Sequence, residues 1–251
     1  MTTTPHARSF DAAAASYAAN RPSYPPALLD AVEELAGRPL AGARAADIGA
    51  GTGILTVLLH DRGARVVAVE PGDGMTAEFR RFLPGVPVVR GDGNRLPLAA
   101  GSLGLVAYAQ SWHWTDPDRS LPEAFRVLRP GGALAVVRND SDESVPWIAE
   151  QTARLRRFFG AGTAAEETAE AATARSLPAG RPGFTTRRVP WSRRVPLETH
   201  LANLATFSDF LVLGPERTGA FLARERERLG ALFPGGTVEE VYLASASVAV
   251  R

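Results

Sequence analysis

The sequence predicts an α/β fold built around a parallel β-sheet. Apolar strand segments alternate with helical segments from residue 43 to residue 137, and the connections are too short for anything other than βαβ crossovers. The first of these strands runs into a glycine-rich turn that leads directly into a helix, an arrangement that presents backbone N–H groups to a ligand. A ligand site is therefore expected at the carboxyl ends of the strands.

The individual elements follow from the same patterns. Two N-terminal helices are predicted at 10–19 and 25–36, the second opened by a proline at a tolerated position. Core strands are predicted at 44–49, 65–70, 86–90, 103–109 and 133–138, with helices at 53–62, 74–83 and 117–128. Beyond the fifth strand we expect helices at 147–159, 164–176, 197–211 and 216–233, and strands at 185–195 and 238–250.

Composition excludes several kinds of chemistry. The 251 residues are 45% hydrophobic, enough for a sizeable core, and the net charge of +1 gives no electrostatic reason to expect nucleic acid as an obligatory partner. The chain has no cysteine and no lysine, which excludes thiolate chemistry and Schiff-base chemistry. No apolar run is long enough to span a membrane and no signal peptide is evident, so a cytoplasmic location is expected.

The glycine-rich turn distinguishes between two classes of adenosine-bearing cofactor. A dinucleotide fingerprint, G-x-G-x-x-G, would place its third glycine at the position of Ile54, whereas this turn has Gly49, Gly51 and Gly53. Asp47 at the leading edge of the turn would repel a pyrophosphate but attract an ammonium group. The turn therefore favours a cofactor with a cationic amino-acid tail.

The segment Asp47-x-Gly49-x-Gly51-x-Gly53 resembles the first motif of class I S-adenosylmethionine (SAM)-dependent methyltransferases. Four later segments resemble further motifs of that family in the same order: 65–71, 88–93, 102–114 and 126–134. The resemblance covers about the first 140 residues and is closest to the small-molecule, methyltransferase domain 11-like subgroup. It implies a Rossmann-like, mostly parallel seven-stranded sheet with an antiparallel last strand, N-terminal cap helices and inserted lid helices.

The resemblance also implies which residues bind SAM. Glu70 lies about 20 residues after the first glycine, a spacing suited to an acid that holds ribose hydroxyls; an ordinary turn residue is the alternative. Asp92 matches the position that contacts the adenine amino group, and Met75 either packs near the ribose or simply belongs to the core. The predicted cofactor-binding residues are Tyr17, Arg21, Asp47, Gly49, Gly51, Gly53, Glu70, Pro71, Met75, Asp92, Gly93, Gln110 and Ser111.

An N-terminal segment resembles the family's cap over the cofactor. Tyr17 and Arg21 are four residues apart and so share one face of a helix. Arg21 can pair with the cofactor carboxylate through two hydrogen bonds, and Tyr17 can close over the sulfonium end. A surface helix with a hydrophobic staple is the alternative.

Donor and acceptor are expected to meet just after the fourth and fifth strands. His113 is either a general base or a residue that shapes the pocket, with Asp140 or a water molecule as other proton acceptors. The predicted substrate-binding residues are Tyr24, Trp112, His113, Trp114, Asn139 and Trp147. The remaining histidines, His6, His60 and His200, show no metal-ligand spacing, so surface positions and no metal site are expected.

Arginines cluster around Trp191 on a predicted edge strand. Arg187, Arg188, Arg193 and Arg194 flank this tryptophan, and charges on an edge strand deter pairing with another sheet. An anionic substrate is the alternative explanation.

The resemblance implies transfer of the methyl group of SAM to a small-molecule acceptor in secondary metabolism, with S-adenosylhomocysteine as the product. In-line displacement would be driven mainly by proximity and desolvation. The alternatives are a non-methylating reaction such as cyclisation, a non-catalytic SAM-binding protein and a nicotinamide dehydrogenase. We expect a monomer or homodimer in which 1–251 form one domain, with cap helices at 1–40, the SAM-binding core at 41–140, the lid region with strand six at 141–235 and the final strand at 236–251.

Overall fold

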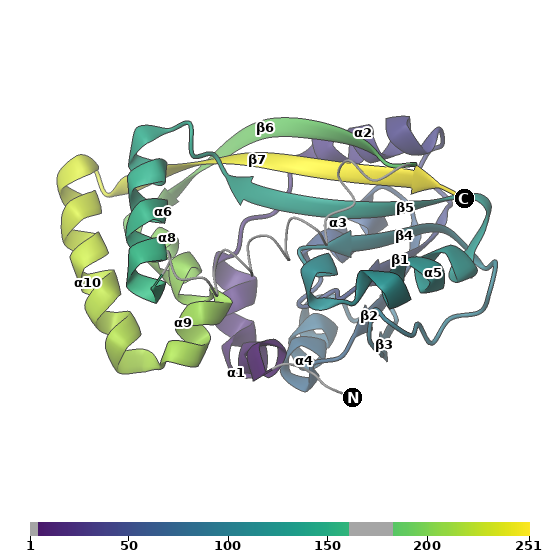
Figure 1. The fold of residues 1–251 in the computed structure, drawn as a ribbon, viewed down its shortest axis with the longest axis horizontal. Coiled ribbons are helices and arrows are strands. Elements are labelled where there is room, and N and C mark those ends of the chain that lie inside the picture. The colour runs from purple at the N-terminus through teal and green to yellow at the C-terminus, as the bar shows by residue number, and fades with distance from the viewer. Residues whose placement is uncertain (1–4, 161–182) are drawn as a thin grey trace.

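A computed structural model describes residues 5–160 and 183–251. Its centre is a seven-stranded sheet with the order β3-β2-β1-β4-β5-β7-β6 (Figure 1). Strands β1 to β5 pair in parallel, whereas β7 pairs antiparallel with both β5 and β6. The predicted mostly parallel sheet with an antiparallel last strand is therefore confirmed. The strands are β1 (Arg44–Ile48), β2 (Arg65–Glu70), β3 (Val88–Arg90), β4 (Leu103–Ala109), β5 (Leu128–Ser141), β6 (Thr185–Pro196) and β7 (Thr237–Val250).

Helices cover both faces of the sheet, so the central strands are buried on both sides. Ala45 of β1 packs with Leu28 and Leu55 in one cluster, while Ala46, the next residue, packs with Val127 in a second cluster on the opposite face. The helices are α1 (Pro5–Asn20), α2 (Pro26–Ala36), α3 (Ile54–Asp61), α4 (Asp73–Phe82), α5 (Pro117–Val127), α6 (Pro146–Phe159), α8 (Leu197–Ala205), α9 (Ser208–Leu213) and α10 (Pro215–Leu232), with a 3-10 turn, η1 (Trp112–Trp114).

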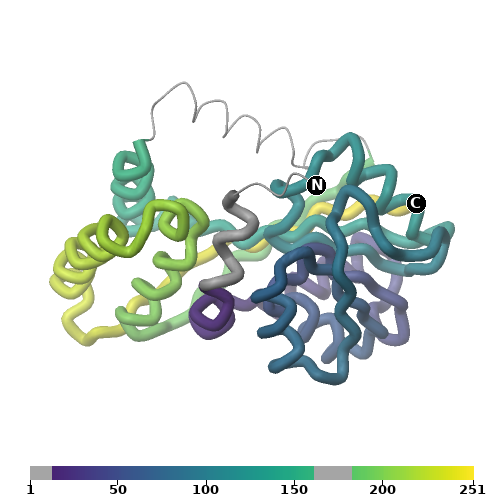
Figure 2. The backbone as a smooth tube through the Cα atoms, turned by 90° about the horizontal axis from the view of Figure 1, so that it is seen from below, coloured from purple at the N-terminus to yellow at the C-terminus, as the bar shows by residue number. Residues whose placement is uncertain are grey.

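Helices α6, α8, α9 and α10 form a separate group, which we name the lid. Figures 1 and 2 show the lid on one side of the molecule and the sheet with its covering helices on the other, with α1 between them. The lid has a small core of its own, made of Leu201, Leu204, Phe210, Phe221 and Leu229.

The two longest antiparallel strands connect the sheet to the lid. Strand β5 pairs with β7 only as far as Ser141 opposite Tyr242, whereas the pairing of β6 with β7 continues to Pro196 opposite Thr237. The first residues of β7 therefore lie beyond β5, where the chain of β5 has already turned away into α6. Residues 240–242, near this end of the hairpin, line the cavity that lies between the sheet and the lid.

Several boundaries differ from those predicted. The predicted helix at 197–211 is two helices, because the Thr206 side chain donates to the Asn203 carbonyl over 2.6 Å and Phe207 is extended (φ −68°, ψ 140°). Strand β5 is longer than predicted because β7 continues to pair with it as far as Ser141. The helix predicted at 164–176 lies outside the described residues. Among the helices that the structure describes, none is long and apolar enough to cross a membrane.

Candidate functional site: a glycine cradle beside a polar cavity

The turn between β1 and α3 is held against the end of β2. The backbone N–H groups of Gly49 and Ala50 donate to the Val69 carbonyl at 2.8 and 3.2 Å. The Glu70 carboxylate then accepts from the N–H of Gly51 at 2.8 Å and from that of Gly72 at 2.7 Å. Glu70 thus joins the two turns that follow β1 and β2, and a carboxylate with two oxygens can still accept further hydrogen bonds.

The three glycines of the turn all have positive φ but have different surroundings. A Cβ on Gly49 would lie 2.5 Å from Cβ of Ser111, and one on Gly53 would lie 2.6 Å from Cδ1 of Leu83. A Cβ on Gly51 would meet nothing within 4 Å. Gly49 and Gly53 therefore allow close packing, whereas Gly51 faces a space that a side chain would fill. The residues fit a ligand that approaches the backbone at Gly51.

Asp47 lies beneath this turn with its side chain buried. Its Oδ2 accepts a hydrogen bond from the Thr56 hydroxyl at 2.6 Å, while Oδ1 is buried and has no partner among the described residues. Burial raises the pKa of Asp47 to about 7, against the opposing effect of the Thr56 hydrogen bond. An orphaned carboxylate oxygen at this position fits a cationic group on a bound ligand.

The predicted adenine-side residues lie at the ends of the neighbouring strands. Asp92 accepts from the Asn94 N–H at 2.7 Å, and the Gly93 carbonyl accepts from the Tyr108 hydroxyl at 3.1 Å. A Cβ on Gly93 would lie 2.8 Å from Cγ2 of Thr115, so this position requires glycine for packing. Met75 is buried within α4, and the Pro71 carbonyl accepts a hydrogen bond from Arg90.

The segment after β4 has a strained backbone. Gln110 has a φ of 53°, the one positive value at a non-glycine position among the described residues. Its side chain donates to the Asn139 carbonyl at 2.9 Å, and the Asn139 side chain accepts from the Trp191 indole at 2.9 Å. The next residue, Ser111, donates to the Ile48 carbonyl. These contacts tie the ends of β1, β4 and β5 together beside the glycine turn.

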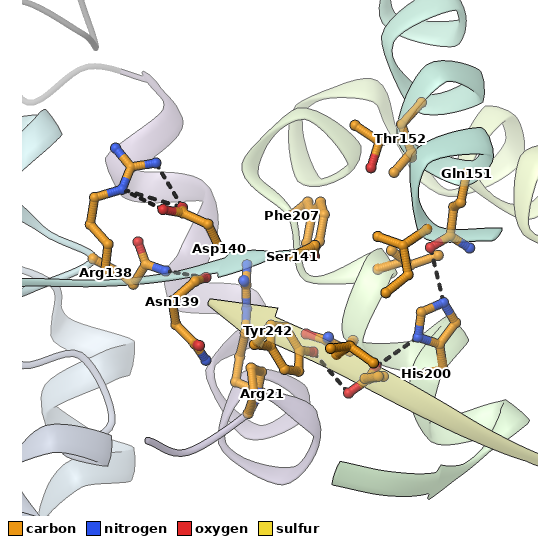
Figure 3. A pocket seen from close by; sticks show the side chains of 18 of the residues that line it. Arg21, Arg138, Asn139, Asp140, Ser141, Gln151, Thr152, His200, Phe207 and Tyr242 are labelled. Carbon is orange, nitrogen blue, oxygen red and sulfur yellow. Dashed lines mark hydrogen bonds and ion pairs between the residues drawn. The ribbon is translucent and has the colours of Figure 1, made fainter. Parts of the chain in front are cut away.

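A cavity of about 370 Å³ lies between this edge of the sheet and the lid (Figure 3). Its size is within the range typical of small-molecule sites. Of the predicted site residues, those that line it are Tyr17, Arg21, Tyr24, Gln110, Asn139, Asp140 and Trp147. The glycine turn, residues 49–53, is named the glycine cradle. It lies outside the lining, so the cavity and the cradle are adjacent but separate.

Three predicted substrate-binding residues are not brought to the cavity. Trp112 is 3% exposed and packs edge-on against Tyr108 inside the core, with ring centroids 4.8 Å apart. Trp114 is 41% exposed, and its ring lies 4.7 Å from that of His113. None of the three lines the cavity.

The two predicted proton acceptors differ in their surroundings. His113 lies on the surface, yet desolvation by the surrounding chain and then the Arg138 charge lower the pKa of its imidazole to about 4. Asp140 lines the cavity and accepts from Arg138 Nη2 at 2.7 Å. His113 is thus neutral at physiological pH but a weak base, and Asp140 is the candidate that reaches the cavity.

Arg21 lies between two aromatic rings at the side of the cavity. Its guanidinium carbon is 4.8 Å from the ring centroids of both Tyr17 and Phe207. Its Nη2 donates to the Thr206 carbonyl at 3.0 Å, and its buried Nε has no partner in the described part of the chain. This group therefore has hydrogen-bonding capacity to spare.

The prediction of a surface position is wrong for His200, because the fold buries this residue at the lid end of the cavity. His200 is 4% exposed; its Nδ1 lies 2.6 Å from Oε1 of Glu240 and its Nε2 lies 3.1 Å from Oε1 of Gln151 (Figure 3). Glu240 Oε2 also accepts from Arg193 Nε at 2.5 Å and from the Tyr242 hydroxyl at 2.8 Å.

No motif in the sequence marks His200, Gln151 or Glu240 as site residues. One signal was available for His200. The spacing of Leu201 and Leu204 after it places all three in the buried part of a helix. His60, by contrast, is exposed as predicted. No group of three or more histidine, aspartate or glutamate side chains suited to a metal ion occurs within residues 5–160 and 183–251.

Fold and site together define a class: a Rossmann-like sheet with a glycine turn that suits an adenosine-bearing ligand, beside a cavity for a second molecule. The comparisons with known proteins identify the family. Residues 46–136 match the family model described as a methyltransferase domain. This match assigns the core of the sheet to a methyltransferase domain.

Relatives and solved structures agree with this assignment. An uncharacterized methyltransferase of Mycobacterium tuberculosis is 44% identical over 142 residues, which are 57% of this chain and 56% of that protein. A demethylmenaquinone methyltransferase of Beutenbergia cavernae is 39% identical over 129 residues, or 51% of this chain and 53% of that protein. The matched region thus spans about half the length of these curated relatives.

A structure from Anaeromyxobacter dehalogenans, named as a type II methyltransferase, superposes with a TM-score of 0.62 at 26% identity. The superposition covers 92% of this chain and 96% of that one. The similarity in fold therefore extends over the lid, beyond the region that the sequence comparisons match.

Proposed function

We propose that this protein transfers the methyl group of SAM to a small-molecule acceptor that binds in the cavity beneath the lid. The observation that carries the proposal is the open space at Gly51, bordered by Glu70 and adjacent to a cavity of about 370 Å³. A cofactor site next to an acceptor site is the arrangement that group transfer requires.

The cofactor would lie along the carboxyl ends of β1, β2 and β4. Glu70 would accept from the ribose hydroxyls while it keeps its two backbone donors, and Asp47 would face the ammonium group of the methionine tail. Arg21, with its unpartnered buried Nε, would pair with the carboxylate, and Tyr17 would close over the sulfonium. The remaining proposed cofactor contacts are Gly49, Gly51, Gly53, Pro71, Met75, Asp92, Gly93, Gln110 and Ser111.

SAM supplies a methyl group already activated as an electrophile by its sulfonium. The protein's task is to hold the acceptor in line and to exclude water. Aromatic rings in the cavity wall, those of Tyr24, Trp147 and Tyr242 among them, are suited to this task. Where the acceptor must lose a proton, Asp140 in the cavity wall is our proposed acceptor of that proton in preference to His113.

The acceptor itself is defined only by class. Relatives include proteins named demethylmenaquinone methyltransferase and malonyl-[acyl-carrier protein] O-methyltransferase, which differ in acceptor chemistry. The lid, which encloses the cavity, lies outside the region matched by the family model. A role in secondary metabolism, a cytoplasmic location, the four-segment division of one domain and a monomeric or homodimeric state stay predictions.

Mass spectrometry with SAM that carries a trideuterated methyl group tests the proposal. The protein, incubated with this cofactor and a metabolite extract, is expected to produce a compound that carries the heavy methyl group. The Gly51→Ala variant should not produce it. If S-adenosylhomocysteine binds tightly but no labelled compound forms from any extract, methyl transfer is contradicted and a non-methylating use of SAM is favoured.

A further inference from the structure

The segment that joins α1 to α2, residues 21–25, lies beside the cavity and has no strand partner among the described residues. We name it the cap linker. Arg21, Pro22 and Tyr24 of this segment line the cavity. Its two prolines have no backbone N–H to donate. The position of the cap linker therefore has to be fixed by side chains from other elements.

Asn139 of β5 holds the middle of the cap linker. Its Nδ2 donates to the Ser23 carbonyl at 3.3 Å, and its Oδ1 accepts from the indole N–H of Trp191 at 2.9 Å. An indole nitrogen can only donate, so the amide oxygen must face Trp191 and the NH₂ group is left to face Ser23. Trp191 therefore determines the orientation in which Asn139 holds the linker.

Trp191 of β6 reaches Asn139 across an intervening strand. Strand β7 lies between β6 and β5, and its residue opposite Asn139 is Ala244, whose small side chain leaves room for the indole. The indole also stacks on Tyr242 of β7, with ring centroids 5.1 Å apart and an interplanar angle of 22°. Because stacking fixes the ring, the indole N–H has a fixed direction.

A second residue of β6 holds the start of the cap linker. Arg193 is two residues after Trp191 and so lies on the same face of the strand. Its Nη2 donates to the carbonyl of Asn20, the last residue of α1, at 2.8 Å. A cation is favoured at the carbonyl end of a helix. Arg21 is thus held from both sides, through the carbonyl before it and through that of Ser23 after it.

Arg21, the residue fixed in this way, is the proposed partner of the cofactor carboxylate. Figure 3 shows Arg21 and Asn139 on the side of the cavity away from His200 and Gln151. The Asn139 carbonyl accepts from the side chain of Gln110, which follows β4 beside the glycine cradle. Three strands, β4, β5 and β7, separate β6 from β1. The edge strand therefore reaches the cofactor side of the cavity only through the cap linker and Asn139.

We propose that Trp191 and Arg193 are positioning residues for the cofactor. They hold the cap linker so that Arg21 pairs with the carboxylate in the amino-acid tail of SAM. Neither side chain lines the cavity, and both act through the linker backbone. This inference rests on the proposed function, since it concerns the cofactor site of that function. Trp191 gives the cleaner test, because Arg193 also pairs with Glu240.

Two ligands separate a positioning role from a general structural one. S-Adenosylhomocysteine and 5′-methylthioadenosine share the adenosine and the sulfur, but only the first has the amino-acid tail. In calorimetric titrations of the full chain, we expect the wild-type protein to bind S-adenosylhomocysteine at least about tenfold more tightly. Trp191→Phe keeps an aromatic ring against Tyr242 but removes the N–H. It should weaken S-adenosylhomocysteine about fivefold and leave 5′-methylthioadenosine unchanged.

A matched control and an independent variant accompany this test. Ser192→Ala, at the next residue on the opposite face of β6, removes a hydrogen bond to Glu239 on the surface and should change neither affinity. Asn139→Ala removes the group through which Trp191 acts, so it should cause at least the same selective loss, even if Trp191→Phe does not fold. The double variant should lose no more than Asn139→Ala alone.

Four results would overturn the proposal: equal affinity of the wild-type protein for the two ligands, equal weakening of both ligands in a variant, unchanged S-adenosylhomocysteine affinity in both variants, or additive losses in the double variant. If the wild-type protein binds neither ligand, the proposed function fails and this inference fails with it. If the wild-type protein binds both ligands as expected and only the variants disagree, the positioning role alone fails.

Discussion

The glycine cradle and the lid end of the cavity are built by opposite means. The cradle depends on contacts between residues close in the chain, such as Asp47 with Thr56 and Gly51 with Glu70, which are 9 and 19 positions apart. The lid end depends on side chains from four elements, where Gln151 meets Glu225 across 74 positions and Arg21 meets Thr206 across 185. A site built from residues close in the chain can be recognised as a sequence motif, whereas a site built from distant residues cannot.

The largest effect on cofactor binding is expected at Gly51, the glycine of the cradle that faces open space. Gly51→Ala should weaken S-adenosylhomocysteine binding by more than about 100-fold, or about 3 kcal/mol, because the new Cβ occupies ligand space. Isothermal titration calorimetry measures this loss. Gly101→Ala is the matched control, since Gly101 has a similar φ of +62° and equally open surroundings in a turn before β4. Equal affinity of the two variants would mean that the open space at Gly51 is not the cofactor cradle.

At the lid end, the largest expected effect is on stability. Glu240→Gln should lower the free energy of unfolding by about 3 kcal/mol, because it leaves the largely buried charge of Arg193 without its carboxylate and disturbs the hydrogen bonds with His200 and Tyr242. Chemical denaturation measures the change. Glu239→Gln, next in sequence but paired with Arg194 on the surface at 3.8 Å, should change stability by less than about 1 kcal/mol. A similar small loss for both would show that the buried chain of hydrogen bonds does not stabilise the lid.

A variant at Glu70 tests whether the glycine cradle binds the cofactor through a side chain as well as through its backbone. Glu70→Ala should weaken S-adenosylhomocysteine binding by about 2 kcal/mol, since it removes the proposed ribose acceptor and frees the N–H groups of Gly51 and Gly72. Calorimetry on the folded variant measures the change. Unchanged affinity would refute the ribose assignment and leave Glu70 as a residue that only shapes the turn.

The smallest expected effect is a pH dependence that has opposite signs for stability and for binding. The folded-state pKa of Asp47 is raised from 3.8 to about 7, so its contribution to stability is fully present below pH 3.8 and is lost as pH rises through 7. Between pH 6 and 8 this amounts to about 1 kcal/mol. Cofactor affinity should rise over the same interval, because the ionised carboxylate attracts the ammonium group.

Asp47→Asn should remove both trends, which thermal unfolding and calorimetry at pH 6 and 8 would show. If cofactor affinity in the wild-type protein falls as the pH rises, Asp47 does not bind the ammonium group.

The sequence predicted the fold almost completely up to the fifth strand, because the strand periodicity and the turns are local. It could not distinguish Gly51 from Gly49, since only the packed structure shows that Ser111 fills the space beside one and nothing fills the space beside the other. It also placed Trp112 in the substrate site, whereas the fold turns this side chain into the core against Tyr108.

The lid was the least predictable part for a physical reason. In the sequence, His200 is an isolated polar residue. Only the folded chain brings Gln151 of α6 and Glu240 of β7 to it as hydrogen-bond partners. The break between α8 and α9 depends on one side-chain hydrogen bond from Thr206, which helical periodicity does not show. Long-range packing, rather than local propensity, determines both features.

Calorimetric titration of the intact chain with S-adenosylhomocysteine, alongside NADH, tests the central claim most directly. We expect saturable binding of S-adenosylhomocysteine at one site per chain and no heat with NADH. Binding of NADH, or no binding of S-adenosylhomocysteine, would contradict it.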